Sequence, residues 1–266
     1  MSYGISYQDV SRVHTPAAIQ ESWGTRTVCT ARPEYGFERL VVRAGAVVRS
    51  HYFVDSRCAY YVETGTVVAL VREADGTASF SRLAKGGVLR VGSGVVHAFR
   101  GGDADTEMYC FSSRNQGERR YAESPGEAER SWSAAASVPP VEATGRTQDF
   151  RDKYWGSIET IVDDDFAGKR IFLRRGGQSS LEFHTHKVES YYLHAGSVRV
   201  GLRTGRAENR SIVLSAGQSF DVIPGLMHMR IGVTDALIIE ASTRDTDSDS
   251  HLVEDGTKYT HVDIQE

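Results

Sequence analysis

The stretch Gly177-Gln-Ser-Ser-Leu-Glu-Phe-His184-Thr-His186-Lys-Val-Glu189-Ser-Tyr-Tyr-Leu-His-Ala-Gly196 decides the fold of this chain. It is rich in residues that favour β-strands, in which successive side chains alternate between two faces. His184 and His186 therefore share a face. Glu189 breaks this parity, so we place a bend at Lys187–Val188 that turns the carboxylate toward the two imidazoles.

A third histidine follows a second turn, in the sequence Ile223-Pro-Gly-Leu-Met-His228. Three imidazoles and one carboxylate within a β scaffold would bind a divalent first-row metal and leave positions open for a substrate. The predicted ligands are His184, His186, Glu189 and His228. This ligand set suits Fe, Mn, Co, Ni or Zn, so the sequence leaves the metal open.

These motifs resemble those of the cupin superfamily. Glu189 is followed by six residues and then Gly196, as in the first cupin motif, and Gly217…Pro224-Gly225-x-x-His228 matches the second with one residue missing between Pro and Gly. More narrowly, residues 150–256 resemble the cupin domain of bacterial mannose-6-phosphate isomerases. The segments that carry this second resemblance are Tyr154-Trp-Gly-Ser157, Lys169-Arg-Ile171 and Ser180-Leu-Glu-Phe-His-Thr-His186.

The two halves of the chain form an internal repeat. The segment Cys58-Ala-Tyr-Tyr-Val-Glu-Thr-Gly65 aligns with Glu189-Ser-Tyr-Tyr-Leu-His-Ala-Gly196, and at the same offset Gly94-Val-Val-His97 aligns with Gly225-Leu-Met-His228. A fixed offset through both motifs indicates a tandem duplication. Short strand patterns separated by turn signals run through both halves, without a long helical period.

We therefore predict an all-β bicupin made of two tandem jelly-roll β-barrels. The expected domains are an N-terminal barrel at 1–112, a polar interdomain linker at 113–148, and a C-terminal barrel with an acidic tail at 149–266. The linker is charged and poor in strand-forming residues.

The expected metal site is degenerate in the first barrel, where only His97 is clearly retained. Cys58 takes the place of Glu189, while Phe53 and Asp55 take the places of His184 and His186. His51 lies near but out of register with these two ligands. We expect this barrel to serve in packing or docking. An altered site formed by His51, Asp55, Cys58 and His97 stays open, because a strand bulge could restore the register.

Three kinds of side chain, a glutamate, a tyrosine and arginines, are expected around the metal in the second barrel. Glu182 shares the parity of His184, which makes it a fifth ligand or a general base. Tyr191 shares the parity of Glu189, so its hydroxyl could meet a substrate oxygen or donate a proton. Arg230 could bind an anionic substrate, and Arg170 and Arg174, on one face of a strand, are weaker candidates.

Three functions compete at this site. The resemblance favours a metal-dependent isomerase or epimerase acting on a small hydroxylated anionic substrate, such as a sugar phosphate, in which Glu182 moves the proton and Tyr191 or Arg230 holds the substrate. The same ligands suit an Fe(II)-dependent dioxygenase of a small chelating metabolite. The third is a non-catalytic protein in which the metal organises a small-molecule pocket.

The composition limits the kinds of binding partner and the compartment that we expect for this protein. A formal net charge of −4 over 266 residues argues against nucleic-acid binding. No apolar run of about eighteen residues is present, so no membrane span is expected. The start Met-Ser-Tyr-Gly-Ile-Ser has no signal-peptide character, and three cysteines without metal-ligand spacing suit a reducing compartment, so we expect a cytoplasmic protein. Exposed aromatic residues and sheet edges would be compatible with a homodimer.

Overall fold

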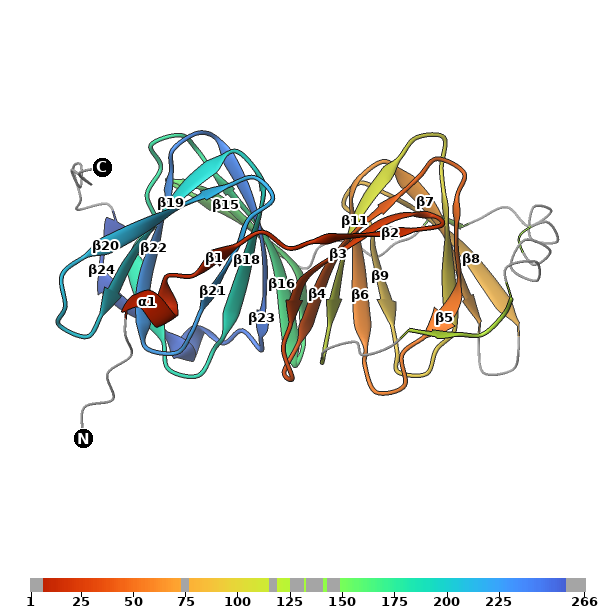
Figure 1. The fold of residues 1–266 in the computed structure, drawn as a ribbon, viewed down its shortest axis with the longest axis horizontal. Coiled ribbons are helices and arrows are strands. Elements are labelled where there is room, and N and C mark those ends of the chain that lie inside the picture. Colours follow the sequence, from red (N-terminus) through yellow and green to blue (C-terminus); the bar gives the residue numbers. More distant parts are fainter. Residues whose placement is uncertain are drawn as a thin grey trace. The chain divides into compact units, whose positions relative to one another are not determined.

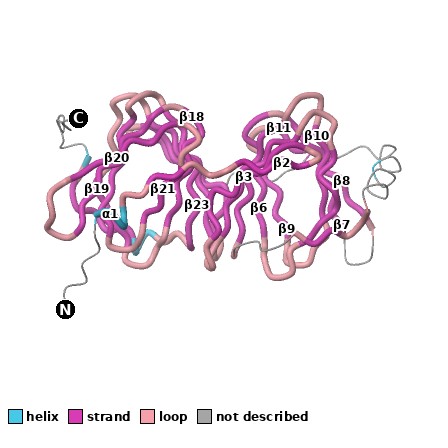
Figure 2. The backbone as a smooth tube through the Cα atoms, in the orientation of Figure 1, coloured by secondary structure: helices cyan, strands magenta, loops and turns pink. Residues whose placement is uncertain are grey.

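The computed structural model describes residues 7–72, 77–114, 119–124, 132, 141–142 and 149–256. The chain divides into two compact units. Unit 1 consists of Met1–Pro16 and Gln148–Glu266, and unit 2 of Ala17–Thr147. Nearly every regular element is a β-strand, and each unit is a barrel of facing sheets (Figure 1; Figure 2). The helices among the described residues are too short to cross a membrane.

Unit 1 contains a seven-stranded sheet in the order β1-β21-β18-β23-β16-β15-β14 and a five-stranded sheet in the order β20-β19-β22-β17-β24. Its elements are α1 (Tyr7–Val10), β1 (Val13–His14), β14 (Asp149–Lys153), β15 (Gly156–Asp163), β16 (Phe166–Leu173), β17 (Leu181–His184), β18 (Glu189–Ala195), β19 (Ser197–Thr204), β20 (Arg210–Ser215), β21 (Ser219–Val222), β22 (Leu226–Gly232), β23 (Ala236–Thr243), η1 (Asp247–Asp249) and β24 (Ser250–Glu254).

Unit 2 contains two six-stranded sheets, β2-β3-β4-β11-β6-β9 and β12-β5-β10-β7-β8-β13. Its strands are β2 (Ala18–Glu21), β3 (Gly24–Ala31), β4 (Gly36–Val42), β5 (Val47–Tyr52), β6 (Cys58–Thr64), β7 (Thr66–Arg72), β8 (Ala78–Ala84), β9 (Val88–Val91), β10 (His97–Gly101), β11 (Thr106–Ser112), β12 (Arg120–Tyr121) and β13 (Val141–Glu142).

The strand order agrees with the internal repeat predicted from the sequence. In unit 2 the order β9-β6-β11-β4-β3-β2 corresponds to β21-β18-β23-β16-β15-β14 in unit 1, and β8-β7-β10-β5-β12 corresponds to β20-β19-β22-β17-β24. The repeated glycines Gly65 and Gly196 both have positive φ, +78° and +83°. A Cβ would lie 2.6 Å from Thr106 Oγ1 at the first position and 2.2 Å from the Asp235 carbonyl oxygen at the second, so only glycine permits these turns.

The apolar residues of each barrel point inward and form a separate core. In unit 1 the core is built around Leu193, Val200, Phe220 and Ile238, all fully buried. Unit 2 has an equivalent core around Tyr60, Phe99 and Met108. Strand alternation explains this arrangement, because the apolar residues of each strand recur at a period of two and face the opposite sheet.

The domain boundaries differ from those expected in two places. Val13 and His14 form β1, which pairs with β21, so the first sixteen residues belong to unit 1 rather than to the N-terminal barrel. Two segments of the expected linker are strands of unit 2: β12 pairs with β5, and β13 pairs with β8. Most of the remaining residues of 113–148 lie outside the described residues.

Candidate metal centre

Three strands of unit 1 bring the central residues of the site together. His184 ends β17, Glu189 begins β18, and His228 lies in β22. Glu182 is the register partner of His228 between β17 and β22. Because β18 belongs to the seven-stranded sheet and the other two strands to the five-stranded sheet, the site lies between the two sheets of the barrel.

Both imidazoles face the carboxylate of Glu189. Nε2 of His184 is 3.2 Å from Oε1 of Glu189, and Nε2 of His228 is 3.4 Å from Oε2. Nδ1 of His184 lies 3.0 Å from the Asp249 carbonyl oxygen, and Nδ1 of His228 lies 3.1 Å from that of Leu226. A carbonyl oxygen can only accept, so in both rings Nδ1 carries a proton, and in the neutral ring Nε2 presents a lone pair.

The two Nε2 atoms are buried and have no hydrogen bond of acceptable geometry within the described part of the chain, although both are close to Glu189. Lone pairs that face carboxylate oxygens repel them unless a proton or a cation lies between. Two atoms each about 2.1 Å from one metal and at right angles are about 3.0 Å apart, close to the separations found here. Imidazoles whose Nδ1–H is fixed by a backbone carbonyl are typical metal ligands. These residues fit a divalent metal.

Glu182 completes a group of three side chains that could hold a metal ion. Ligand atoms of Glu182, His184 and His228 lie within 4.8 Å of one another. Oε1 of Glu182 accepts a hydrogen bond from Nη2 of Arg230 at 2.8 Å, and Oε2 accepts one from Oγ of Ser250 at 2.9 Å. Burial alone would raise the pKa of Glu182, but Arg230 and His228 lower it. The carboxylate is therefore ionised at neutral pH.

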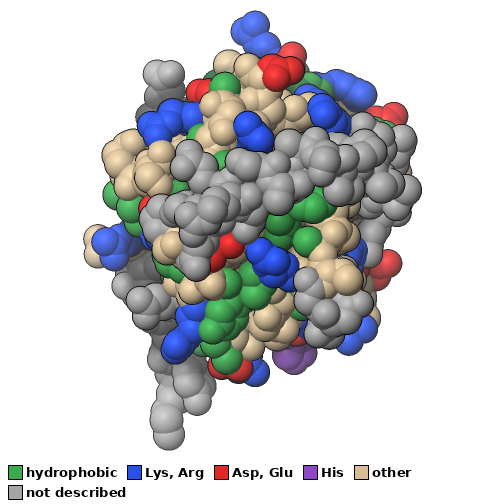
Figure 3. All heavy atoms as spheres, turned by 90° about the vertical axis from the view of Figure 1, so that its right-hand side faces the viewer, with side chains coloured by type: hydrophobic (Ala, Val, Ile, Leu, Met, Phe, Trp, Pro, Cys, Tyr) green, Lys and Arg blue, Asp and Glu red, His purple; other side chains and the backbone are tan. Residues whose placement is uncertain are grey.

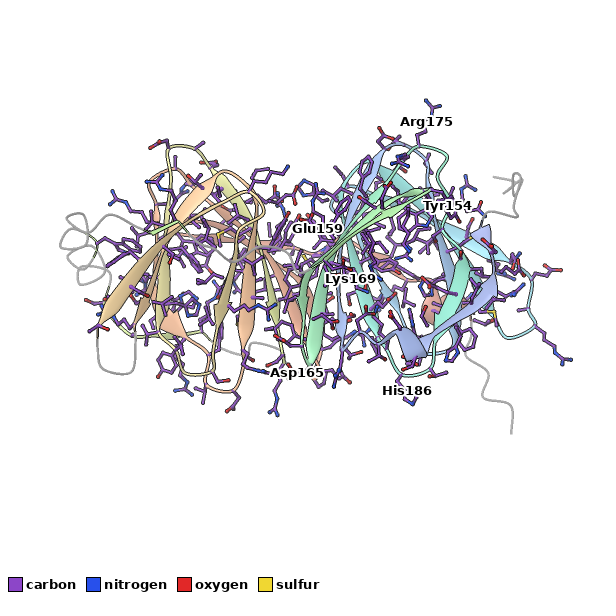
Figure 4. The ribbon with its side chains drawn as sticks, turned by 180° about the vertical axis from the view of Figure 1, so that it is seen from behind. Tyr154, Glu159, Asp165, Lys169, Arg175 and His186 are labelled. Carbon is purple, nitrogen blue, oxygen red and sulfur yellow. The ribbon has the colours of Figure 1, made fainter. Side chains whose placement is uncertain are left out.

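His186 does not join this group, which corrects the predicted three-histidine set. Its side chain is 89% exposed, and Figure 4 shows it at the outer edge of the barrel, directed away from the interior. The physical reason is that β17 ends at His184, so the alternation of faces stops before His186. The bend lies at residues 185–186 rather than at Lys187–Val188.

Lys187 enters the site from this bend, and the sequence analysis missed it. Its side chain is 3% exposed, and Nζ lies 2.6 Å from Oε1 of Glu189, 3.0 Å from Oε1 of Glu240 and 2.8 Å from Oδ1 of Asp245. Burial alone would lower the pKa of Lys187, yet these three carboxylates raise it well above its usual range. Burial would likewise raise the pKa of Glu189, but Lys187 and the two histidines hold it well below normal.

A second buried lysine extends the charge network. Nζ of Lys169 lies 2.5 Å from Oδ2 of Asp245 and 3.9 Å from Oε1 of Glu240. Burial opposes ionisation of Asp245, but Lys187 and Lys169 hold its pKa at about 2. A sequence signal did exist for one member of this network. Glu240 is a single carboxylate within the apolar strand Ala236-Leu-Ile-Ile-Glu-Ala241, and such a residue requires a partner when it is buried.

A cavity of about 280 Å³ adjoins the metal centre. Charged groups of both signs line it, among them Glu182, His184, Lys187, Glu189 and Arg230, and Tyr154, Trp155 and Ile158 supply apolar surface. The cavity has room for a small molecule of a few heavy atoms beside the candidate ligands.

Of two residues predicted to contact a substrate, Arg230 lines the cavity and Tyr191 does not. Arg230 lines the cavity as expected, is 5% exposed, and has a buried Nε without a partner among the described residues. Tyr191 is fully buried and donates its hydroxyl to Oε2 of Glu189 at 2.7 Å, so it orients that carboxylate instead of meeting a substrate.

The two weaker arginine candidates lie elsewhere. Arg170 is 3.8 Å from Glu159 and does not line the cavity. Arg174 is 53% exposed and lies 3.5 Å from Asp152. Arg170 lies on the face of β16 that points away from the site, because Lys169, one residue earlier, takes the inward-facing position, and Arg174 follows the end of the strand.

The residues of unit 2 that were considered for an altered metal site do not come together as the unit 1 residues do. Phe53 and Cys58 are buried in the apolar core, and Asp55 is exposed. His51 is the register partner of His97, as Glu182 is of His228, so His51 occupies the place of Glu182 rather than that of a histidine ligand.

Comparison with solved structures identifies the architecture. The chain is similar to Bacillus subtilis oxalate decarboxylase, an enzyme described as having Mn(II) centres, with a TM-score of 0.71 at 13% identity over 92% of this chain and 80% of that chain. A structure of that enzyme at pH 4.6 gives a TM-score of 0.68 at 13% identity, over 89% and 77% of the two chains.

At this level of identity the likeness concerns the fold. No protein-family model matches the chain, and no curated protein matches it in sequence. The narrower resemblance to mannose-6-phosphate isomerases stays a prediction. The strand order within each barrel, the internal repeat and the structural match agree, and the chain has the two-barrel fold seen in oxalate decarboxylase.

Proposed function

We propose that unit 1 is a metal-dependent enzyme that acts on a small anionic substrate. The observation that carries this proposal is the pair of buried Nε2 lone pairs, on His184 and His228, that face the two oxygens of Glu189. Glu182 lies close enough to both histidines to be a further ligand or to act on a bound molecule. The adjoining cavity gives a substrate access to the same residues.

Arg230 supports an anionic substrate. It is buried at the cavity, and one of its N–H groups has no partner in the described residues, so it can donate to a carboxylate or phosphate oxygen. Lys169 and Lys187 already neutralise Glu240 and Asp245. Arg230 is itself bonded to Glu182 and lies 3.7 Å from Glu240, but of these three cations it is the one with a donor that has no partner in the described residues, so we assign it the role of orienting the substrate.

The reaction class we favour is isomerisation or epimerisation by proton transfer. A bound divalent metal would polarise a carbonyl and a neighbouring hydroxyl and so stabilise an enediolate. Glu182 is ionised and can accept a proton from the carbon next to the carbonyl and return it to the adjacent carbon, or to the other face of the same carbon. Ser250 and Arg230 hold the two oxygens of Glu182 in place.

A second candidate, oxygenation by a non-haem Fe(II) centre, has its own support. Glu182, His184 and His228 are two histidines and one carboxylate, the ligand set that is typical of Fe(II) oxygenases. In this alternative Glu182 is a ligand instead of a base. A metal-organised binding protein without turnover is the third outcome that an experiment must separate.

The test uses the full chain loaded anaerobically with Mn(II) or Fe(II). Hydroxylated sugar phosphates and small 2-hydroxycarboxylates are incubated with it in D₂O, and oxalate, the substrate named for the similar enzyme, is assayed separately for turnover because it has no carbon-bound hydrogen to exchange. The proposal predicts deuterium in recovered substrate and product by mass spectrometry, and loss of this exchange in Glu182→Gln. Oxygen uptake by the Fe(II) form, without anaerobic exchange, would support the oxygenase. Bound metal without exchange, oxygen uptake or any other turnover would contradict both enzymatic proposals.

A further inference from the structure

Unit 2 contains a buried polar cluster that the proposed chemistry of unit 1 does not use. His51 and His97 are each 1% exposed, and their ring centroids are 4.3 Å apart. Nδ1 of His51 lies 2.8 Å from the Arg49 carbonyl oxygen, and Nδ1 of His97 lies 3.0 Å from that of Val95. As in unit 1, these contacts place the ring proton on Nδ1 and leave a lone pair on Nε2.

Only one of the two Nε2 lone pairs has a hydrogen-bond donor among the described residues. Nε2 of His97 accepts a hydrogen bond from the hydroxyl of Tyr60 at 2.7 Å. Nε2 of His51 is buried and has no partner among the residues described. Burial and the neighbours His97 and Arg119 lower the pKa of His51 well below its usual range, so its ring is neutral and Nε2 is an acceptor in need of a donor.

Arg119 brings a buried positive charge close enough to the same cluster to lower the pKa of both histidines, and it belongs to a chain of ion pairs that continues through Glu38 and Arg26 to Glu21. Its side chain is 8% exposed, and Nη2 donates to Oε2 of Glu38 at 2.7 Å. Glu38 also accepts a hydrogen bond from Nη1 of Arg26 at 2.8 Å, so one carboxylate serves two guanidinium groups. Nε and Nη1 of Arg119 are buried without a partner in the described residues.

The unsatisfied groups are therefore two N–H donors on a cation and one imidazole acceptor, and they do not bond to each other. Unpaired buried groups of this kind cost free energy unless another molecule satisfies them. A metal cation does not match the cluster, because Arg119 contributes a positive charge where unit 1 contributes Glu182 and Glu189. An anion matches the two donors, and a hydroxyl on that anion matches His51.

We propose that the interior of unit 2 is a binding site for a small monoanion that carries a hydroxyl group, such as hydrogen carbonate or a short 2-hydroxy acid. Arg119 would donate to the anionic oxygens, and the hydroxyl would donate to Nε2 of His51. The ligand must be small, because Phe53, Tyr60 and Phe99 of the packed apolar core surround the histidines. Unit 2 is therefore a ligand-binding unit and not merely a packing partner. On the face shown in Figure 3, charged side chains of both signs are interspersed and open to solvent. Arg119, by contrast, is only 8% exposed.

The test is isothermal titration of the full chain with hydrogen carbonate, L-lactate and propionate. Propionate is lactate without the hydroxyl, so the ratio of the affinities for lactate and propionate reports the contact with His51. Comparison of the affinities for hydrogen carbonate and lactate shows which of the two hydroxyl-bearing anions the site prefers. We expect Arg119→Met to weaken binding of the preferred probe by about 10- to 100-fold, the range for a hydrogen bond to a charged group. Arg26→Met, which removes the other guanidinium from Glu38, should change it by less than about 3-fold.

A second variant keeps the proposal testable if Arg119→Met does not fold. His51→Phe fills the position without an acceptor, and it should abolish the preference for lactate over propionate while propionate still binds. Arg230→Met removes the cation of the unit 1 cavity and should leave the titration unchanged. Equal affinity of the preferred probe for the wild type and Arg119→Met, a His51→Phe variant that keeps the preference, or no binding of any probe at 10 mM to the wild type would overturn the proposal.

Discussion

Nζ of Lys187 lies 2.6 Å from the same carboxylate oxygen of Glu189 that faces His184. A buried ammonium would thus compete with a bound metal for one candidate ligand oxygen. It also neutralises Glu240 and Asp245 from a single position. The first role would weaken metal binding and the second stabilises the fold, so a variant of Lys187 can separate the two effects.

Replacement of Lys187 by Met should destabilise unit 1 by about 3–5 kcal/mol without metal, because the buried Glu189 and Glu240 and the partly buried Asp245 lose their common partner. Divalent metal should restore more stability in this variant than in the wild type, since it would supply the missing positive charge. Thermal unfolding with and without Mn(II) measures both effects. Lys153→Met is the control, because Lys153 is only partly buried and lies on the edge strand β14. A smaller metal-induced shift in Lys187→Met than in the wild type would contradict this account.

His228→Ala and His186→Ala should differ sharply in metal content. His228 is fully buried and faces Glu189, whereas His186 is 89% exposed. Loss of His228 should reduce metal affinity by more than the roughly 10- to 100-fold that loss of an outer-shell hydrogen bond costs. His186→Ala should retain wild-type metal content. Atomic absorption after dialysis against a metal buffer measures the metal content of both variants. An equal loss of metal in the two variants would show that His186 is a ligand after all.

Asp249 holds the bend that separates these two histidines. Its carboxylate accepts hydrogen bonds from the backbone N–H groups of Thr185, His186 and Lys187, at 2.9, 3.1 and 2.8 Å. Its own carbonyl oxygen accepts from Nδ1 of His184. Asp249→Ala should cost about 2 kcal/mol of stability through these lost bonds and lower metal affinity by about 10- to 100-fold.

The matched control for Asp249 is Asp247→Ala, which changes an exposed carboxylate of the same short helix η1. Urea unfolding and metal titration of both variants give the comparison. If the Asp247 variant lost metal affinity as strongly as the Asp249 variant, the effect would come from the charge of η1 and not from the orientation of His184.

Unit 2 should lose stability in mild acid. Burial lowers the pKa of His97 from 6.5 to about 4, so the unfolded chain binds this proton more tightly than the folded chain does. Stability from the neutral ring is complete above pH 6.5 and is lost as the pH falls through about 4, at about 1.4 kcal/mol per pH unit between these values.

Hydrogen exchange of the amides of β10, measured from pH 7.5 to 4.5 and corrected for intrinsic rates, follows this loss. His97→Gln should reduce the slope, because a glutamine can still accept the Tyr60 hydroxyl and does not titrate, while His51, whose pKa burial also lowers, keeps part of the dependence. His186→Gln, a change at an exposed histidine, should keep the wild-type dependence. An unaltered slope in His97→Gln would show that other groups cause the acid sensitivity.

The fold was predictable because its signals are local and repeated. The strand periodicity and the fixed offset between the two halves required two similar all-β barrels, and Gly65 and Gly196 marked equivalent turns. The pair His184 and His228 was also predictable, since each lies within a regular strand.

The errors arose where a strand ends or where distant segments meet. Parity placed His186 beside His184, but the strand stops between them. The buried position of Lys187 depends on Asp249, more than sixty residues later, which fixes the bend through backbone hydrogen bonds. A partner at that distance leaves no signal in the local pattern. The same holds for Arg119, whose place beside His51 follows from the pairing of β12 with β5.

The placement of Met1–Pro16 in unit 1 has a consequence for how the protein is made. Val10 packs in the core of unit 1, and Val13 pairs with Phe220 at the edge of its larger sheet. The ribosome therefore releases this segment first, then all of unit 2, and only afterwards the strand against which the segment docks. Nascent unit 2 can close on its own while the leading residues remain without their acceptor. A cut at residue 148 would separate the segment from that acceptor and, where the segment dissociates, leave unit 1 with an uncovered sheet edge.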